Sequence, residues 1–177
     1  MHYLIISAIG ADRPGIVSEL TGIITHHGGN IEQSRMTKLG SNFTILMLVK
    51  VDCKWEESLI FALQAIKEIS ITTKATESHT VIKGSKNCQI SLNGADNEGI
   101  VNVLSKYLTD KSINILDMET HISNAPITGT PLFNLMAITT ISENTGIAEM
   151  QSDLNQIAQK LGVEIVVHQS TSIEEIV

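Results

Sequence analysis

The sequence lacks the features that mark a specialised class of protein. Only 3% of its residues are aromatic and 3 of 177 are proline, whereas 42% are apolar. The core of such a chain is expected to consist of Ile, Leu and Val. No apolar run approaches the roughly 20 residues that cross a bilayer, and the N-terminus has no positive region or cleavage site of a signal peptide. We therefore expect a cytoplasmic protein without membrane contact.

Cysteine and basic residues are also scarce. Cys53 and Cys88 lie 35 positions apart and no CxxC motif occurs, which favours structural or neutral thiols in a reducing compartment. The twelve Lys and Arg residues are scattered singly in a chain of net charge −7. Because binding of nucleic acid depends on clustered cations, direct contact with nucleic acid is not expected.

Motifs of common enzymes are missing as well. The chain has no P-loop lysine, no GxSxG and no HExxH, and its six histidines show no metal-ligand spacing. Asp12 and Asp96 are two acids in equivalent loops, and we favour helix capping over a catalytic carboxylate pair for both. The sequence predicts a non-enzymatic protein with no cofactor and no metal.

An internal repeat dominates the organisation of the chain. Residues 10–31 align without a gap with residues 94–115 and are identical at ten of 22 positions, including the Gly-Ala-Asp that opens each copy. An apolar run precedes each copy, and apolar residues at helical spacing follow the loop. Each copy therefore begins as strand, loop and helix.

Both halves continue with the same order of elements. In the first half we expect strands over 3–9, 30–37, 43–51 and 70–73, and helices from 16 and over 55–69. In the second half we expect strands over 88–92, 113–121, 132–141 and 163–167, with a helix that ends at Gly162. This order predicts an α+β fold of two tandem ferredoxin-like βαββαβ domains, residues 1–82 and 86–177, each an antiparallel four-stranded sheet covered by two helices. The polar segment 79–87 is the expected connector.

The loop between the first strand and helix has a composition suited to a small anion. Gly10 would let the backbone leave the strand at unusual dihedrals, Asp12 would cap the helix, and Pro14 would set φ near the helix start. Gly15 leaves the mouth of the helix without a side chain. Exposed N–H groups and the partial positive charge there would suit a carboxylate.

These residues resemble a known family. Asp12-Arg13-Pro14-Gly15-Ile16-Val17, followed by Gly28-Gly29-Asn30-Ile31 on a βαββαβ pattern, is similar to the ACT domain, a regulatory module that binds amino acids between paired copies. A tandem pair with residues 129–133, Gly-Thr-Pro-Leu-Phe, in its second copy resembles the glycine cleavage system transcriptional repressor family. The resemblance implies a cytoplasmic homodimer that represses glycine cleavage genes. It would act through a LysR-type activator, without reading DNA itself, and glycine would relieve the repression.

The resemblance also implies which residues contact the ligand. In the first copy these are Asp12, Arg13, Pro14, Gly15, Ile16, Asn30 and Ile31, and in the second Asp96, Gly99 and Asn114, with Asn97, Glu98, Ile100 and Ile115 at the other matching positions. The second copy departs from the motif, because Asn97-Glu98 replaces Arg-Pro and Ser112-Ile113 replaces the twin glycines. Glu98 would repel a carboxylate, so the first loop is the better candidate.

Two alternative functions remain open from the sequence. The chain could be an amino-acid-binding subunit that regulates a metabolic enzyme, or an interaction module whose loops bind nothing. Its start also resembles the regulatory segment of formyltetrahydrofolate deformylases, although the second βαββαβ copy leaves no room for their catalytic domain. Relative to the first copy, six extra residues lie within 122–131. They form either tolerated surface or a contact surface.

Overall fold

The chain divides into two compact units, a first unit of Met1–Thr80 and a second of Val81–Val177. The computed structural model describes residues 2–77, 85–126 and 128–169. Residues 82–84 of the expected domain boundary and the first six residues of the expected connector therefore lie outside the described part of the chain.

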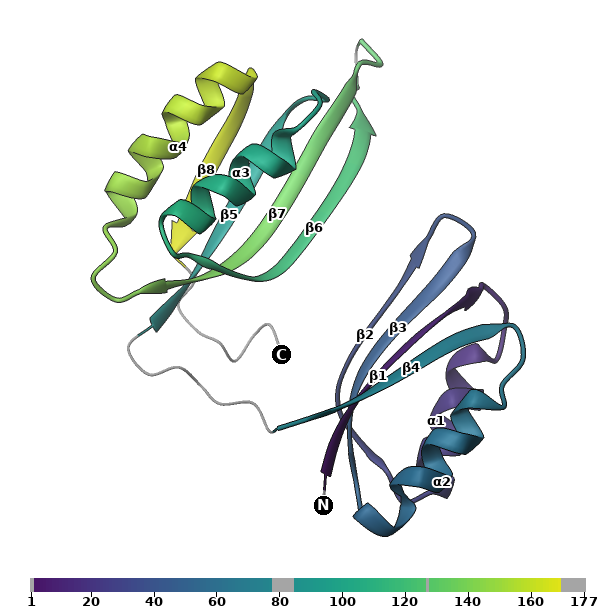
Figure 1. Ribbon diagram of the computed structural model, residues 1–177. Coiled ribbons are helices and arrows are strands. Elements are labelled where there is room, and N and C mark those ends of the chain that lie inside the picture. The colour runs from purple at the N-terminus through teal and green to yellow at the C-terminus, as the bar shows by residue number, and fades with distance from the viewer. Residues whose placement is uncertain (1, 78–84, 127, 170–177) are drawn as a thin grey trace. The chain divides into compact units, whose positions relative to one another are not determined.

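Both units have the order βαββαβ that the repeat predicts (Figure 1). In the first unit the elements are β1 His2–Ala11, α1 Ile16–His26, β2 Asn30–Leu39, β3 Asn42–Val51, α2 Cys53–Gln64 and β4 Ile69–Thr76. In the second they are β5 Ser85–Ala95, α3 Ile100–Asp110, β6 Asn114–Asn124, β7 Pro131–Ser142, α4 Ile147–Leu161 and β8 Val163–Gln169.

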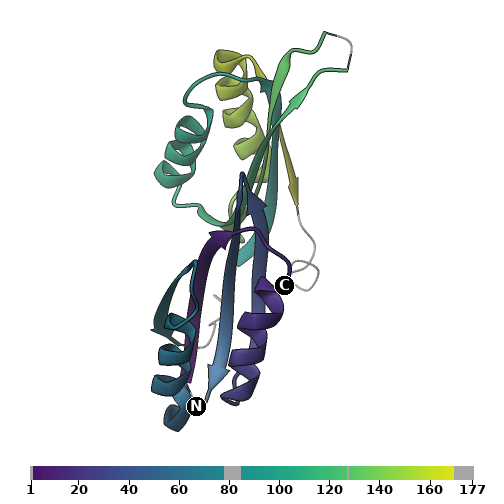
Figure 2. The same cartoon turned by 90° about the vertical axis from the view of Figure 1, so that its right-hand side faces the viewer.

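Each unit is one antiparallel sheet of four strands with two helices on one of its faces (Figures 1 and 2). The strand orders are β2-β3-β1-β4 and β6-β7-β5-β8, so β2 and β6 lie at equivalent edges. The predicted α+β class and the two ferredoxin-like folds are confirmed. The opposite face of each sheet is covered by neither of its helices, and we call it the open face.

Apolar side chains fill the layer between helices and sheet. In the first unit, Leu20 and Ile24 of α1 and Leu59 of α2 are fully buried against alternate residues of β1 such as Leu4 and Ile6. Burial of one such side chain contributes about 1.5–3 kcal/mol. The second unit repeats the arrangement with the buried residues Ile90, Leu92, Leu104, Leu108, Leu135 and Leu154. The buried residues of the helices thus recur at helical spacing along the sequence.

Both second strands contain a β-bulge at the same place. The pairing of β2 with β3 shifts between Ile31 and Gln33, and the pairing of β6 with β7 shifts between Ile115 and Asp117. The extra residue breaks the alternation of faces. Gln33 consequently lies opposite Leu48, on the open face, although Ile31 packs against the core.

Two expected boundaries are wrong. Helix α2 ends at Gln64, not at 69, because the chain turns through Glu68, whose φ is +67°, into β4. Strand β5 begins at Ser85, inside the expected connector, because Ser85 pairs with Ser142 and the Lys86 ammonium donates to the carbonyls of residues 143 and 145 at 3.1 Å. Glu68 is neither a glycine nor a proline, so its residue type does not mark the turn after α2.

The β6–β7 hairpin is longer than its counterpart in the first unit. Strands β2 and β3 are joined by the turn Gly40-Ser41, whereas β6 ends at Asn124 and β7 begins at Pro131. Most of the predicted extra segment is outside the strands, and the Ala125 N–H donates to the Thr130 carbonyl at 2.9 Å. Residue 127 lies outside the described residues.

Gly10 and Gly94 are required for space and not for unusual dihedrals, so that expectation is wrong. Both lie inside strands, and neither has a positive φ. A Cβ at Gly94 would lie 2.7 Å from the Cα of Val163, and one at Gly10 would lie 2.8 Å from the Glu68 carbonyl oxygen. In each unit the last strand therefore starts against the backbone of the first.

This close approach predicts the effect of adding one methyl group. Gly94→Ala should lower the free energy of unfolding by about 1–3 kcal/mol, because the backbone of Val163 must move. Gly22→Ala is the matched control, since nothing lies within 4 Å of its Cβ and alanine is favoured in a helix by up to about 1 kcal/mol. Urea unfolding of both variants measures the difference. If Gly94→Ala and Gly22→Ala unfold with equal free energies, the steric role of Gly94 is wrong.

Candidate functional site

The loop between β1 and α1 is shaped by a left-handed glycine. Gly15 is the N-cap of α1 with a φ of +88°, and no side chain caps this helix. The Glu19 N–H and the Ser18 hydroxyl both donate to the Gly15 carbonyl, at 2.9 and 3.0 Å. Because residues with a Cβ seldom adopt this conformation, Gly15 fixes the direction in which the chain enters the helix.

Asp12 does not cap α1, so the predicted capping role is wrong. It lies three residues before the N-cap and its carboxylate pairs with the Lys38 ammonium at 2.8 Å, near the end of β2. The Asp12 N–H donates to the Ser41 carbonyl at 3.2 Å. Asp12 therefore ties the loop to the β2–β3 turn.

Arg13 and Pro14 lie between these anchors. The Arg13 guanidinium forms an ion pair with the carboxylate of Glu19 in the first turn of α1, with both side chains partly exposed. Pro14 directly precedes the N-cap Gly15, near the start of the helix. Its fixed φ therefore shapes the approach to the helix and not its first turn.

The loop borders a shallow depression of about 550 Å³ at the mouth of α1. Its lining comes from the loop, from the first turns of the helix and from one aromatic ring of β3: Asp12, Arg13, Gly15, Ile16, Val17, Ser18, Thr21 and Phe43. The partial positive charge of a helix N-terminus favours an anion here. The structure thus brings most of the first-copy candidates together on one surface.

Asn30 and Ile31 lie at the other end of the same sheet. Asn30 pairs with Lys50, which pairs with Tyr3, whereas the loop follows Ala11. Eight residues of β1 separate these levels, which is about 26 Å at the rise of a strand. Asn30 is exposed and its amide donates to the Glu32 carboxylate at 2.8 Å. Within one unit, the two halves of the predicted site do not meet.

The second copy repeats the backbone of the loop with different contacts. Gly99 is the N-cap of α3 with a φ of +83°, and again no side chain caps the helix, so the capping role predicted for Asp96 is also wrong. The Asn97 amide donates to the Leu161 carbonyl at the end of α4, at 3.0 Å. Asn114 begins β6 opposite Thr140, at the far end of its sheet. The divergent residues therefore brace the second unit internally.

A comparison with protein families now bears on these units. The family described as "ACT domain" matches residues 2–76, which is the whole described sheet and helix layer of the first unit. The first unit therefore matches the ACT domain family over its whole described fold. The second unit has the same topology and the same left-handed glycine, although the family match does not extend to it.

Individual proteins resemble this chain over different lengths. The glycine cleavage system transcriptional repressor of Escherichia coli (strain K12) is 54% identical over 48 residues, 27% of this chain and 25% of that protein. The match thus spans about a quarter of the length of this curated relative. The crystal structure of an unknown protein from Galdieria sulphuraria has a TM-score of 0.82 at 26% identity, covering 96% of this chain and 99% of that one. A crystal structure provisionally named a glycine cleavage system transcriptional repressor has a TM-score of 0.67 at 20% identity, covering 97% and 98%. That last likeness shows the fold.

A charged cluster outside the ACT loops joins the two helices of the second unit. The Lys111 ammonium lies 2.8 Å from the Asp153 carboxylate, which also accepts a hydrogen bond of 3.4 Å from the Tyr107 hydroxyl. The bond to Lys111 lowers the pKa of Asp153 and raises the pKa of Lys111. Burial, and then the charge of Asp153, raises the pKa of Tyr107. The groups satisfy one another, so we assign them to helix packing.

Two classes of site are not found in the described part of the chain. Across residues 2–77, 85–126 and 128–169, no group of three or more His, Cys, Asp or Glu side chains is placed to hold a metal ion. In the same ranges no helix combines the length and the apolar character that a membrane span requires.

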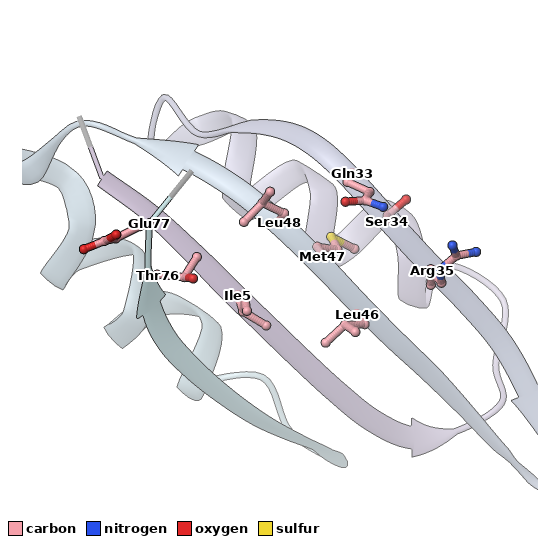
Figure 3. Close-up of a pocket in the computed structure, with 9 residues that line it drawn as sticks. All are labelled: Ile5, Gln33, Ser34, Arg35, Leu46, Met47, Leu48, Thr76 and Glu77. Atoms are coloured by element: carbon pink, nitrogen blue, oxygen red, sulfur yellow. The ribbon is translucent and has the colours of Figure 1, made fainter. Parts of the chain in front are cut away.

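The open face of the ACT unit carries a hollow that the motif analysis missed. It measures about 330 Å³, with Ile5, Leu46 and Leu48 along its floor and Arg35 and Glu77 at opposite rims (Figure 3). The signal was present in the sequence, because the first strand is apolar at every position from Tyr3 to Ile9 except Ser7. Such a strand is apolar on both faces.

The two aspartates near helix starts give a direct test of the capping correction. Asp52 is a true N-cap, whose carboxylate accepts from the Lys54 N–H at 3.2 Å, whereas Asp12 caps nothing. Asp52→Ala should lower the free energy of unfolding by about 1 kcal/mol. Asp12→Ala should cost less than about half of that, because it removes only an exposed ion pair. Urea unfolding compares them, and equal losses would restore the capping role.

Proposed function

We propose that this chain is a non-enzymatic, amino-acid-responsive regulator whose first loop contacts the ligand. Specifically, it represses glycine cleavage genes, responds to glycine and acts through a LysR-type activator without binding DNA. The match of the first unit to the ACT domain family and the 54% identity to a repressor of that name support this role. The observation that carries it is the uncapped helix mouth beside Asp12.

The chemistry of the loop suits a small zwitterion. Backbone N–H groups of the first turn of α1 are available to a carboxylate, because no side chain caps them. The carboxylate of Asp12 is at the rim of the same depression and suits an ammonium group. Lys38, which pairs with Asp12 in the absence of ligand, would yield part of that contact. The depression is much larger than glycine, so a second surface must close it.

A paired ACT unit is the surface that fits. Strand β2 is an edge strand, and its end carries Lys38, the partner of Asp12. If the β2 strands of two units pair in antiparallel fashion, the start of one strand lies beside the end of the other. If the first units of two chains pair in this way, Asn30 and Ile31 of one chain lie beside the β1–α1 loop of the other. The proposed site is therefore complete only in a paired assembly, which we propose to be a homodimer.

The size of the ligand limits the affinity. Glycine has five heavy atoms, and at a ceiling of about −1.5 kcal/mol per atom its best possible dissociation constant is a few micromolar. Occupancy therefore requires glycine well above that level. At a concentration about 100 times Kd, binding adds about 2.7 kcal/mol to the stability of the folded state.

Thermal unfolding in 10 mM glycine tests the site. Glycine should raise Tm of the native chain by several degrees, and Asp12→Ala should abolish the rise because the ammonium loses its partner. Lys38→Met separates binding from loop tethering, since it breaks the same ion pair and leaves the carboxylate in place. It should keep the rise. Asp110→Ala, at the exposed end of α3, is the matched control. If glycine does not raise the Tm of the native chain, the ligand proposal is wrong.

The proposed mode of repression has its own test. Gel mobility of a glycine cleavage promoter should be unchanged by micromolar amounts of this chain alone, because its net charge is −7. With the purified LysR-type activator present, the chain should retard the activator–DNA complex further, and 10 mM glycine should reverse that effect. Retardation of DNA by the chain alone would contradict the proposal.

A further inference from the structure

The open faces of the two sheets are exposed and partly apolar. On the first, Ile9 and Leu46 are 48% and 46% exposed, and on the second Met136 is 51% exposed. Met136 lies opposite Glu119 just as Leu46 lies opposite Arg35, so the two residues are equivalent in the repeat. Contiguous apolar surface on a sheet face indicates contact with another surface.

The two open faces carry opposite charges. Arg35 on β2 and Lys74 on β4 place a cation at each edge of the first face, with Lys50 on β3. The paired outward positions of the described strands of the first unit contain no acid. The carboxylate of the bulge residue Glu32 accepts from the amide of outward Asn30 at one end of the face, and Glu77 lies beyond the end of β4. In the second unit the outward acids are Asp117 and Glu119 on β6 and Glu164 on β8. Equivalent positions of the two faces thus carry side chains of opposite charge, for example Arg35 and Glu119.

We propose that the open face of the first unit packs on the open face of the second unit of another copy of this chain. Two such contacts, related by a two-fold axis, close a dimer in which every chain contributes one face of each kind. The apolar centre around Ile5, Leu46 and Leu48 meets Met136 and Val166, and the charged edges meet each other.

The charge pattern selects this pairing over the others. Stacked sheets keep their strands roughly aligned about 10 Å apart. The edge strand β2 then lies over either β6 or β8, and β4 lies over the other. Arg35 faces Glu119 or Glu164 in both arrangements, and Lys74 faces the remaining acid. Two copies of the same face would instead oppose like charges, which disfavours them.

The polar centre of the second face does not oppose burial. The Asn93 amide donates to the Asn134 side-chain oxygen, and the Asn134 amide donates in turn to the Ser123 hydroxyl at 2.9 Å. Both amides are therefore paired within the sheet before any partner arrives. Covering a polar group that already has its hydrogen bonds costs much less than covering a bare one.

The area of the faces favours a reciprocal contact. Four strands about 4.8 Å apart and about eight residues long make a face of about 500 Å². One pair of faces buries about 1,000 Å² in total, which is less than a stable interface usually needs. Two reciprocal pairs bury about 2,000 Å², within the range of stable dimers. The area thus argues for a second copy bound through both units.

Charge reversal tests the proposal by light scattering coupled to gel filtration. Arg35→Glu/Lys74→Glu and Glu119→Lys/Glu164→Lys each repel the opposite face, so each variant alone should have half the native mass. An equimolar mixture of the two should recover the native mass, because every contact then joins an acidic face to a basic face. Lys67→Glu/Lys106→Glu, on the helix side, is the control for net charge and should keep the native mass.

Several outcomes would overturn the proposal. These are a monomeric native chain, charge-reversed variants with the same mass as the control, or a mixture that stays at half mass. Far-UV circular dichroism verifies folding, and Arg35→Gln/Lys74→Gln replaces a variant that fails to fold. Asp12 lies in the loop beyond β1 and Asn30 lies at one end of the first open face, and no charge-reversed variant changes either residue. A monomeric native chain would overturn both this contact and the paired glycine site, whereas a dimeric native chain whose charge-reversed variants keep its mass would overturn this contact alone. Absence of a glycine effect on Tm leaves the mass measurements intact.

Discussion

The burial of one sheet face under two helices is the constraint on which the other features of this protein depend. In the first unit, α1 and α2 cover the inward residues of β1 and β3, and the fully buried Leu20 and Leu59 fill the layer between them. Two helices cover one face of a four-stranded sheet, so the opposite face and the β2 edge remain available for contacts. The topology brings the loop that enters α1 close to the end of the edge strand β2. Lys38 of β2 therefore pairs with Asp12 of the loop.

The repeat shows that one backbone can carry two sets of chemistry. Gly28 and Ser112 are equivalent, and both adopt a left-handed conformation, with φ of +67° and +56°. Serine pays a steric penalty there that glycine avoids. The fold therefore requires a left-handed residue at this turn, whether that residue is glycine or serine. The same holds for Gly15 and Gly99, whose loops share a backbone but lead to different side-chain contacts.

Much of the fold was readable from the sequence, whereas the site was readable only in part. Apolar runs, β-branched residues and turn residues predicted a strand for every strand of the described residues, and apolar spacing of 3.6 residues predicted the helices, because burial imposes that period. The end of α2 was not readable, since the left-handed residue there is Glu68. A capping role for Asp12 failed because capping depends on the exact backbone before the helix, and Lys38 is brought near only by the β2–β3 turn. The weak alternation of residues 30–37 has its cause in the bulge after Ile31, which no residue type announces.

The shared bulge also records the order in which this chain was assembled. Both copies carry it at the same position, and both carry the left-handed glycine before the first helix. Features common to two halves of one chain are most simply inherited from a single ancestral half, so these predate the duplication. The Arg35–Glu119 difference and the longer β6–β7 hairpin belong to the period after it. The surface residues of the two copies therefore differ more than the irregularities of their backbones do.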